Sequence, residues 1–247
     1  MNINSVIKEA SLTLKKNFVK TAQLDSEILL GKVINKDREY IILNQDSKVE
    51  KDAYNQFKNL IKQRSKGRPI AYLTGKKYFW KHQFQINEHV LIPRPDTEII
   101  IEQVLKITKF RPKLRVLDIG IGSGCMLLSV LKEKKDFRGV GIDISKKSVE
   151  ISKLNALNLS LSHRVKIFKT NVDNFNYGKY DLIISNPPYI KELDLKYLDK
   201  DVINFEPKLA LSGGLDGTSK ISKVINKSSE LIKKKGKLIL EISFDQK

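Results

Sequence analysis

The sequence predicts an α/β protein in which a mostly parallel sheet is covered by helices on both faces and is preceded by a small helical domain. Three observations predict this fold class. Apolar residues recur at helical spacing in the first 75 residues, strand and helix patterns alternate from Leu114 onward, and a glycine-rich loop follows the first strand of the alternating region. Strands with continuous Val, Ile and Leu cores that alternate with helices are typical of parallel sheets buried on both faces.

Residues 1–75 predict a small helical bundle. Three apolar stripes at helical spacing run through this region: Val6, Ile7, Ala10 and Leu14; Leu24, Ile28, Leu29 and Val33; and Tyr54, Phe57, Leu60 and Ile61. No comparable alternation of apolar and polar residues indicates a strand there. The region is therefore expected to form a domain of its own.

Residues 76–96 predict a short hairpin that links the two domains. Gly67, Pro69 and Gly75 precede this region, and apolar residues recur within it: Phe79, Phe84, Ile86, Val90 and Ile92. Pro93 and Pro95 end the hairpin in a segment of restricted backbone, and Asp96 or Thr97 can cap the helix that follows.

Residues 97–247 predict the second domain. Strands are expected at LRVLDI (114–119), RGVGID (138–143), RVKIF (164–168), YDLIIS (180–185) and KLILEIS (237–243), and helices at 125–134, 146–158 and 218–234. In such sheets, ligands bind beyond the carboxyl ends of the strands. Asp118, Asp143 and Asn186 fall at these ends, so we expect three strands to bring polar groups to one crevice.

The composition is that of a globular chain with a full apolar core. The 247 residues are 40% hydrophobic and 30% charged, which supports one large domain or a small and a medium one. No apolar run approaches the ~20 residues of a membrane span, and the start does not have the pattern of a signal peptide. We therefore expect a cytoplasmic protein that does not bind a membrane. A single cysteine, Cys125, excludes an internal disulfide framework and a cysteine-based metal cluster, and no metal site is expected.

The net charge of +18 suggests an anionic partner. Only eight of the 46 basic residues are arginine, although bidentate recognition of phosphate favours arginine. The excess of lysine is equally consistent with a compositional bias of the whole chain, and both interpretations stay open.

The segment DIGIGSG (118–124) is a candidate ligand-binding loop. Gly120, Gly122 and Gly124 permit a sharp turn and close approach to a ligand, although a tight strand-to-helix turn would also explain them. The third glycine comes one residue too early for the dinucleotide fingerprint. A negative charge on Asp118 would disfavour a pyrophosphate and favour a cationic ligand. The loop therefore favours a sulfonium such as S-adenosyl-L-methionine over a dinucleotide.

Two further strand ends carry candidate binding residues. Asp143 can accept hydrogen bonds from both ribose hydroxyls of a nucleoside, with helix capping as the alternative interpretation. Asn171 and Val172 follow the third strand, near the expected place of an adenine edge. A surface loop is an equal alternative for these two residues.

The segment SNPPYI (185–190) ends the fourth strand in a rigid polar corner, because consecutive prolines terminate a sheet ladder and fix the backbone. Methyl transfer to an amide or an aromatic amine requires acceptors for both N–H protons, so that the nitrogen lone pair points at the methyl group. The Asn186 side chain and the Pro187 carbonyl can supply two acceptors, and Tyr189 adds a flat face for a planar group. An ordinary Asn-Pro turn is the alternative on local evidence.

The chain resembles the release factor glutamine methyltransferase family, the PrmC/HemK type. Seven blocks carry the resemblance: RPIAYLTG (68–75), LIPRPDTE (91–98), LDIGIGSG (117–124), GIDIS (141–145), SNPPYI (185–190), FEPKLALSGGLDG (205–217) and LILEISFDQ (238–246). The resemblance implies a Rossmann-like class I methyltransferase sheet that uses S-adenosyl-L-methionine. It implies methyl transfer to the side-chain amide nitrogen N5 of the glutamine in the GGQ loop of peptide chain release factors. It also implies that the helical bundle binds the release factor, and we expect a monomer that needs no direct contact with nucleic acid.

The resemblance also implies roles for individual residues. The implied catalytic residues are Asn186, Pro187, Pro188 and Tyr189, and the implied cofactor-binding residues are Asp118, Gly120, Ile121, Gly122, Ser123, Gly124, Asp143, Val172 and Asn186. The block that contains PRPDTE would border the entrance of the cofactor site.

The chain departs from the family pattern in two places. Relatives usually have an acidic and then an aromatic residue where this chain has Asn171 and Val172. A sheet of this class also continues beyond the LILEIS strand, so the last strands are expected to be missing and the catalytic domain to be shortened at its C-terminus. Two alternative functions remain: an adenine-N6 methyltransferase that holds a flipped base of DNA or RNA in the same corner, and a truncated, non-catalytic relative.

Overall fold

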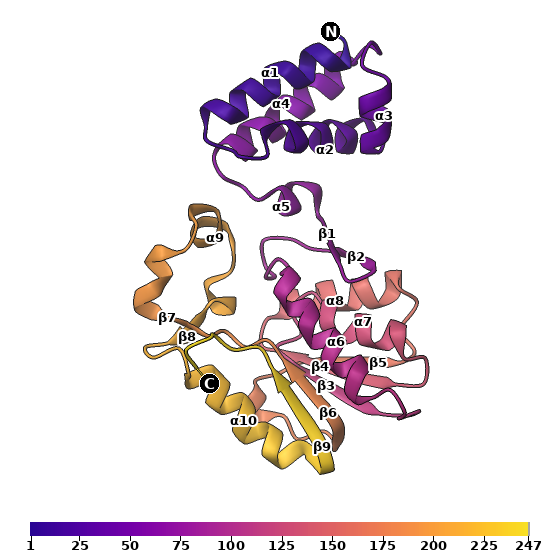
Figure 1. Cartoon of the computed structure of the whole chain (residues 1–247), viewed down its shortest axis with the longest axis vertical. Coiled ribbons are helices and arrows are strands. Elements are labelled where there is room, and N and C mark those ends of the chain that lie inside the picture. Colours follow the sequence, from indigo (N-terminus) through magenta and orange to yellow (C-terminus); the bar gives the residue numbers. More distant parts are fainter. Residues whose placement is uncertain (247) are drawn as a thin grey trace. The chain divides into compact units, whose positions relative to one another are not determined.

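The computed structural model describes residues 1–246, which divide into two compact units (Figure 1). The first unit is Met1–Gly75 and the second begins at Lys76. No apolar cluster of the described residues contains members of both units.

The first unit consists of helices only. They are α1 (Ile3–Lys16), α2 (Ala22–Ile34), α3 (Arg38–Leu43), α4 (Lys51–Ser65) and α5 (Ile70–Thr74). Asn2 caps the start of helix α1, because its side chain accepts a hydrogen bond from the Ser5 amide at 3.0 Å. Helices α2 and α4 are joined by an ion pair of 2.7 Å between Asp25 and Arg64, and both side chains are largely buried. Leu14, Leu29 and Phe57 are fully buried between these helices.

The second unit begins with an antiparallel hairpin of strands β1 (Lys76–Phe79) and β2 (His82–Gln85). Phe79 and Phe84 are buried in the same apolar cluster as the central sheet, so the hairpin is part of the second unit. A 3₁₀ turn (Pro95–Thr97) leads into α6 (Glu98–Ile107). Thr97 occupies the cap position of α6, but its side chain makes no capping hydrogen bond.

The central sheet contains five parallel strands in the order β5-β4-β3-β6-β9. They are β3 (Arg115–Ile119), β4 (Arg138–Asp143), β5 (Val165–Lys169), β6 (Tyr180–Ser185) and β9 (Ile232–Leu240). Counted along the chain, this order is 3-2-1-4-5, in which the direction of winding reverses between β3 and β6. Ligands bind at such a reversal, outside the carboxyl ends of the strands.

Helices cover both faces of the sheet, as the strand patterns predict. Helices α6, α7 (Cys125–Glu133) and α8 (Lys146–Asn158) pack on one face, and α10 (Ser219–Leu231) packs on the other. Leu117 and Ile183 of the central strands are fully buried. The α/β fold class with a parallel sheet and a preceding helical region is thus confirmed.

The segment between β6 and α10 contains elements that the sequence patterns do not predict. It includes β7 (Ile190–Lys191) paired with β8 (Ser212–Gly214), helix α9 (Lys200–Phe205) and 3₁₀ turns at Glu192–Tyr197 and Lys208–Ala210. A further 3₁₀ turn, Val172–Asn174, follows β5. These elements are short, and periodicity is weak over so few residues. Within residues 1–246, no helix combines the length and apolar character needed to cross a membrane.

Candidate active site

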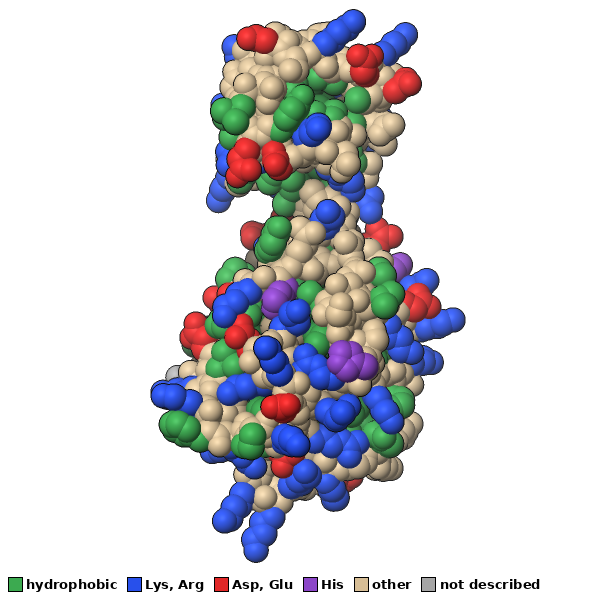
Figure 2. All heavy atoms as spheres, turned by 90° about the vertical axis from the view of Figure 1, so that its right-hand side faces the viewer, with side chains coloured by type: hydrophobic (Ala, Val, Ile, Leu, Met, Phe, Trp, Pro, Cys, Tyr) green, Lys and Arg blue, Asp and Glu red, His purple; other side chains and the backbone are tan. Residues whose placement is uncertain are grey.

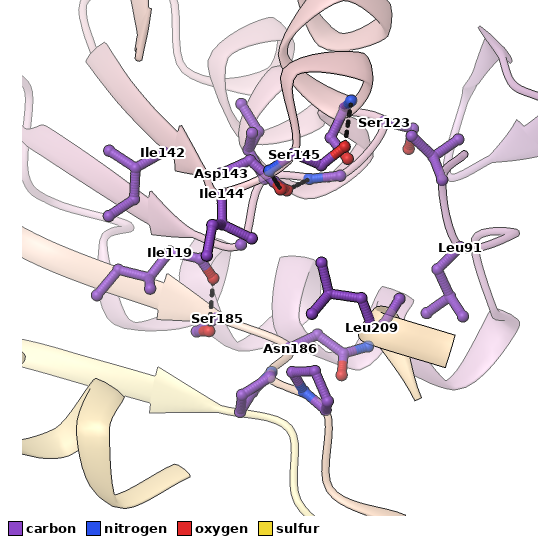
Figure 3. A pocket seen from close by; sticks show the side chains of 18 of the residues that line it. Leu91, Ile119, Ser123, Ile142, Asp143, Ile144, Ser145, Ser185, Asn186 and Leu209 are labelled. Atoms are coloured by element: carbon purple, nitrogen blue, oxygen red, sulfur yellow. Dashed lines mark hydrogen bonds between the residues drawn. The ribbon is translucent and has the colours of Figure 1, made fainter. Parts of the chain in front are cut away.

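A pocket of about 390 Å³ lies at the carboxyl ends of the central strands (Figure 3). Its lining includes the loop after β3, the end of β4, the loop after β5 and the corner after β6. Residues from the segments 89–97 and 207–210 and from the starts of helices α7, α8 and α10 also contribute to the lining. The volume is within the range of small-molecule sites, roughly 300–1,000 Å³.

The glycine loop is bound to the neighbouring strand. The backbone amides of Gly120 and Ile121 both donate to the carbonyl oxygen of Ile142 in β4, at 2.9 Å each. Gly120 has a φ of +80°, and a Cβ there would meet no atom within 4 Å. The backbone at Gly120 therefore borders open space and permits a ligand to approach.

Gly124 differs from the other two loop glycines. It caps the start of α7 with a φ of +84°, and a Cβ there would lie 2.9 Å from Leu128 Cδ1. It is not part of the pocket lining, whereas Gly120, Gly122, Ile121 and Ser123 are. The glycine at this position is explained by close packing against α7.

Asp143 lies at the end of β4 and lines the pocket. Its carboxylate accepts hydrogen bonds from the backbone amides of Gly122 (3.0 Å) and Ser145 (2.8 Å). Burial raises the pKa of Asp143, and these hydrogen bonds oppose the rise. The capping role belongs to Ser145, whose side chain accepts from the Ser148 amide at the start of α8. Asp143 therefore ties the glycine loop to β4 and has carboxylate lone pairs left for a ligand.

Asp118 does not lie at the pocket surface. It is an interior residue of β3, is fully buried and is not part of the lining. Neither carboxylate oxygen has a hydrogen-bond partner in the part of the chain that the structure describes. Burial raises the pKa of Asp118 to about 8. The expectation that three strands bring polar groups to the crevice is therefore met by Asp143 and Asn186 but not by Asp118, which lies too deep in its strand.

The corner after β6 forms the opposite wall of the pocket, across from Asp143 and Ser145 (Figure 3). Its lining residues are Asn186, Pro187 and Pro188. The Asn186 side-chain nitrogen Nδ2 donates a hydrogen bond to Thr97 Oγ1 at 3.2 Å. The Asn186 side-chain oxygen is thereby left to accept a hydrogen bond from a ligand.

Tyr189 stands apart from this corner and is not part of the pocket lining. Its hydroxyl donates to Glu241 Oε1 at 3.2 Å, and its carbonyl oxygen accepts from Gln246 Nε2 at 3.0 Å. Burial raises the pKa of Tyr189 to about 12. The structure thus places the Tyr189 hydroxyl against the end of the chain after β9.

Arg94 belongs to the PRPDTE block that the resemblance places at the entrance of the cofactor site, whereas neither its partner Glu206 nor the lining residue Leu209 was assigned from the sequence. Arg94 lines the pocket and forms an ion pair with the buried Glu206 at 2.6 Å, and Glu206 also accepts from the Ile92 amide at 3.2 Å. Leu209 lies close to Asn186 at the edge of the pocket (Figure 3). The block FEPKLAL that contains Glu206 is visible in the sequence, but nothing in it indicates a contact with residues more than 100 positions earlier.

Residues after β5 also reach the pocket. Asn171 and Val172 both line it, beside Thr170. The Asn171 side-chain oxygen accepts from the Asp173 amide at 3.2 Å, which forms a local turn. Val172 therefore contributes an apolar side chain to the pocket, while the Asn171 side-chain oxygen is hydrogen-bonded to the backbone of its own turn.

The residues present fit S-adenosyl-L-methionine. The open backbone at Gly120 can approach its methionine end, and the carboxylate of Asp143 can accept hydrogen bonds from ribose hydroxyls. Ile142, Ile144 and Val172 supply apolar surface for a planar base. The strand order, the glycine loop and the pocket together define the class I methyltransferase fold.

Comparisons with known proteins agree with this class. Residues 5–75 match the family model of the PrmC N-terminal domain, and residues 96–215 match that of the methyltransferase small domain. A release factor glutamine methyltransferase of Clostridium acetobutylicum is 36% identical over 249 residues, which is 100% of this chain and 87% of that protein. One from Buchnera aphidicola subsp. Schizaphis graminum is 38% identical over 100% of this chain and 88% of that protein. The chain belongs to the release factor glutamine methyltransferase family, which confirms the resemblance.

Longer relatives match as well. A protein named bifunctional methyltransferase from Rickettsia conorii is 33% identical over 99% of this chain, and the chain spans 52% of its length. The chain thus spans about half the length of these relatives. A solved structure of a putative methyltransferase from Methanococcus maripaludis is 20% identical and has a TM-score of 0.42 over 61% of this chain and 57% of that one.

Proposed function

We propose that this chain transfers a methyl group from S-adenosyl-L-methionine to the side-chain amide nitrogen N5 of the glutamine in the GGQ loop of peptide chain release factors. Family membership supports the proposal, because the Clostridium and Buchnera relatives carry that name. The observation that carries it is the Asn186 corner. There, a side-chain oxygen left free by the contact with Thr97 lies across the pocket from Asp143 and the glycine loop.

In the proposed complex, the two walls of the pocket have different tasks. S-adenosyl-L-methionine, when bound, supplies an electrophilic methyl group on a sulfonium. Gly120 and Gly122 would approach its methionine end, and Asp143 would hold its ribose. The cofactor would then occupy the wall formed by the glycine loop and Asp143, and the amide that receives the methyl group would bind at the Asn186 corner.

The Asn186 corner would activate the amide nitrogen by position alone. An amide nitrogen is a weak nucleophile because its lone pair is delocalised into the carbonyl group. The Asn186 side-chain oxygen and the Pro187 carbonyl oxygen would accept its two N–H protons and orient the lone pair. Pro188 keeps the two acceptors rigid, because consecutive prolines restrict the backbone. The nitrogen then loses one proton, and water is the proposed acceptor.

We also propose that the first unit, residues 1–75, binds the release factor, and that the chain acts as a monomer in the cytoplasm. The match of residues 5–75 to the PrmC N-terminal domain supports a family-specific role for this unit. Basic side chains are spread over the visible face of the second unit, with acidic and histidine side chains among them (Figure 2). Several lysines form ion pairs, as Lys223 does with Asp173 and Lys233 with Asp181. The proposed reaction needs no direct contact with nucleic acid.

Incubation with a labelled cofactor tests the proposed substrate. The chain is incubated with methyl-labelled S-adenosyl-L-methionine and either a release factor, the same factor with the GGQ glutamine changed to alanine, or duplex DNA. We expect label on the wild-type factor alone. Label on DNA but not on the factor would favour the adenine-N6 alternative. Binding of the cofactor without label on either would favour a non-catalytic relative.

Asn186→Ala tests the corner itself. Removal of one positioned hydrogen-bonding group from a reaction centre typically costs about 100-fold or more in kcat, so we expect at least that loss. The Kd of S-adenosylhomocysteine, measured by calorimetry, should stay within about twofold, a change of less than about 0.5 kcal/mol. Asn158→Ala, at the exposed end of α8, is the matched control and should retain full activity. An active Asn186→Ala variant would contradict the proposed mechanism.

A further inference from the structure

We propose that Thr97 is a positioning residue that holds the Asn186 amide in its reactive orientation, an inference that rests on the proposed function. Asn186 Nδ2 donates to Thr97 Oγ1 at 3.2 Å, across 89 residues of sequence. Both residues line the pocket. Thr97 comes from the start of α6 and Asn186 from the end of β6, so the contact joins two walls of the site.

The Asn186 amide needs an external contact to be oriented. One end of a primary amide accepts hydrogen bonds and the other end donates them. If the Asn186 amide rotated by half a turn, its NH₂ group would face the NH₂ group of the substrate, and the two sets of donors would oppose each other. Pro187 and Pro188 fix the backbone, but the terminal torsion of an asparagine side chain has only a broad preference. The prolines therefore cannot select the orientation.

Thr97 is held firmly enough to select the orientation of the Asn186 amide. Thr97 is only 3% exposed, and its backbone amide donates to the Arg94 carbonyl oxygen at 3.2 Å. The helix that follows is anchored by Ile101 and Val104, which are fully buried in the core. Once a substrate amide donates to the Asn186 oxygen, Nδ2 requires an acceptor, and the Thr97 hydroxyl supplies it.

Two substitutions at Thr97 separate the effect of the hydroxyl group on catalysis from the effect of the side chain's shape. Thr97→Val removes the acceptor and keeps the branched shape, while Thr97→Ser keeps the hydroxyl. The loss of one hydrogen bond that orients a reacting group changes a rate by about a factor of ten. We therefore expect kcat to fall roughly tenfold in Thr97→Val, with little change in the Kd of S-adenosylhomocysteine. Thr97→Ser should retain most of the wild-type kcat.

Thr108→Val is the matched control. Thr108 lies at the other end of α6, is also buried, and donates from Oγ1 to the Val104 carbonyl oxygen at 2.6 Å. It is not part of the pocket lining. This variant loses a buried hydroxyl from the same helix, so its kcat should stay at the wild-type value even if its stability falls.

A spectroscopic measurement tests the contact without a substrate. The side-chain amide resonance of Asn186 in a ¹⁵N–¹H spectrum can be assigned by its loss in Asn186→Ala. We expect this resonance to shift and its protons to exchange faster with solvent in Thr97→Val, and to stay in place in Thr97→Ser and Thr108→Val.

The two measurements separate the inference from the proposed function. An unshifted Asn186 resonance in Thr97→Val would overturn the inference whether or not a release factor is methylated. A Thr97→Val variant with the wild-type kcat would also overturn it. A wild-type chain that methylates no release factor would overturn the proposed function, while a shifted resonance would still support the contact.

Discussion

Asp118 and Asp143 lie on adjacent strands, and burial raises the pKa of both carboxyl groups, but they differ in their hydrogen bonds. Asp143 receives two backbone hydrogen bonds at the pocket surface. Asp118 pairs in register with Gly141 in β4 and Ile184 in β6, and its carboxyl group is fully buried. Burial favours the neutral form of the Asp118 carboxyl group and raises its pKa to about 8, because the nearby Leu127 backbone amide, which opposes the rise, does not compensate for the lost solvation, and the charge of Asp143 adds to the rise.

This pKa makes the stability of the second unit depend on pH. Asp118 is protonated in the folded protein up to about pH 8, but it ionises near pH 3.8 in the unfolded chain. Between these values the folded state binds one more proton, so the free energy of unfolding falls as pH rises, by up to about 1.4 kcal/mol per pH unit. Asp118→Asn removes this contribution, because asparagine does not titrate.

Urea unfolding of wild type and Asp118→Asn at pH 5, 6, 7 and 8 measures the effect. We expect the free energy of unfolding of the variant, minus that of the wild type, to increase steadily over this range. The difference cancels the titration of all other groups, provided that they are unchanged by the substitution. A difference that is constant with pH would show that Asp118 is not protonated in the folded state.

At the scale of elements, two glycines of β4 determine how closely the neighbouring segments pack. Gly139 and Gly141 are two residues apart, so they lie on the same face of the strand. A Cβ at Gly141 would lie 2.2 Å from Ile121 Cδ1 in the glycine loop, whereas one at Gly139 would lie 2.9 Å from Leu127 Cδ1 in α7. The first glycine therefore sets the position of the loop, and the second sets that of the helix.

Gly141→Ala and Gly139→Ala form a matched pair. Each should lower the free energy of unfolding by about 1–3 kcal/mol, because overpacking strains a well-packed core. Only Gly141→Ala displaces Ile121, which lines the pocket, so only this variant should weaken the binding of S-adenosylhomocysteine, by about tenfold or 1.4 kcal/mol. Chemical denaturation and calorimetry provide the two values. Equal Kd values for both variants would mean that the loop does not depend on this packing.

The same elements show how much can be predicted from sequence. Strands β3, β4 and β6 and helices α7 and α8 carry long apolar patterns, and their positions follow from periodicity together with the glycine and proline segments. The contacts of Asn186 with Thr97 and of Arg94 with Glu206 span 89 and 112 residues. Spacing along the chain contains no information about such contacts, because only the packing of the sheet brings these segments together. The burial of Asp118 cannot be predicted from the sequence for a related reason. In a strand that is buried on both faces, the residue pattern does not distinguish a side chain at the pocket from one in the core.

At the scale of the whole molecule, each of the two units has an apolar core of its own, which in the second unit consists of two clusters. Phe57 and Leu29 belong to the cluster of the first unit, and Leu117 and Ile183 belong to a cluster of the second. The pocket lining comes entirely from the second unit. A ligand that binds there stabilises the structure that forms the pocket, and it stabilises the first unit only if the two units unfold together.

Amide hydrogen exchange, measured with and without S-adenosylhomocysteine, tests whether the two units unfold together. At a free ligand concentration of about 100 times Kd, the bound state gains about 2.7 kcal/mol, which corresponds to roughly 100-fold slower exchange of amides that exchange by complete unfolding of the second unit. We expect this change in β3, β4 and β6 but not at Leu29 and Phe57. Because separate cores permit separate unfolding, amides of the first unit should exchange at the same rate with and without ligand. An equal slowing in both units would show that the chain unfolds as one cooperative structure, and the division into two cores would then not extend to its stability.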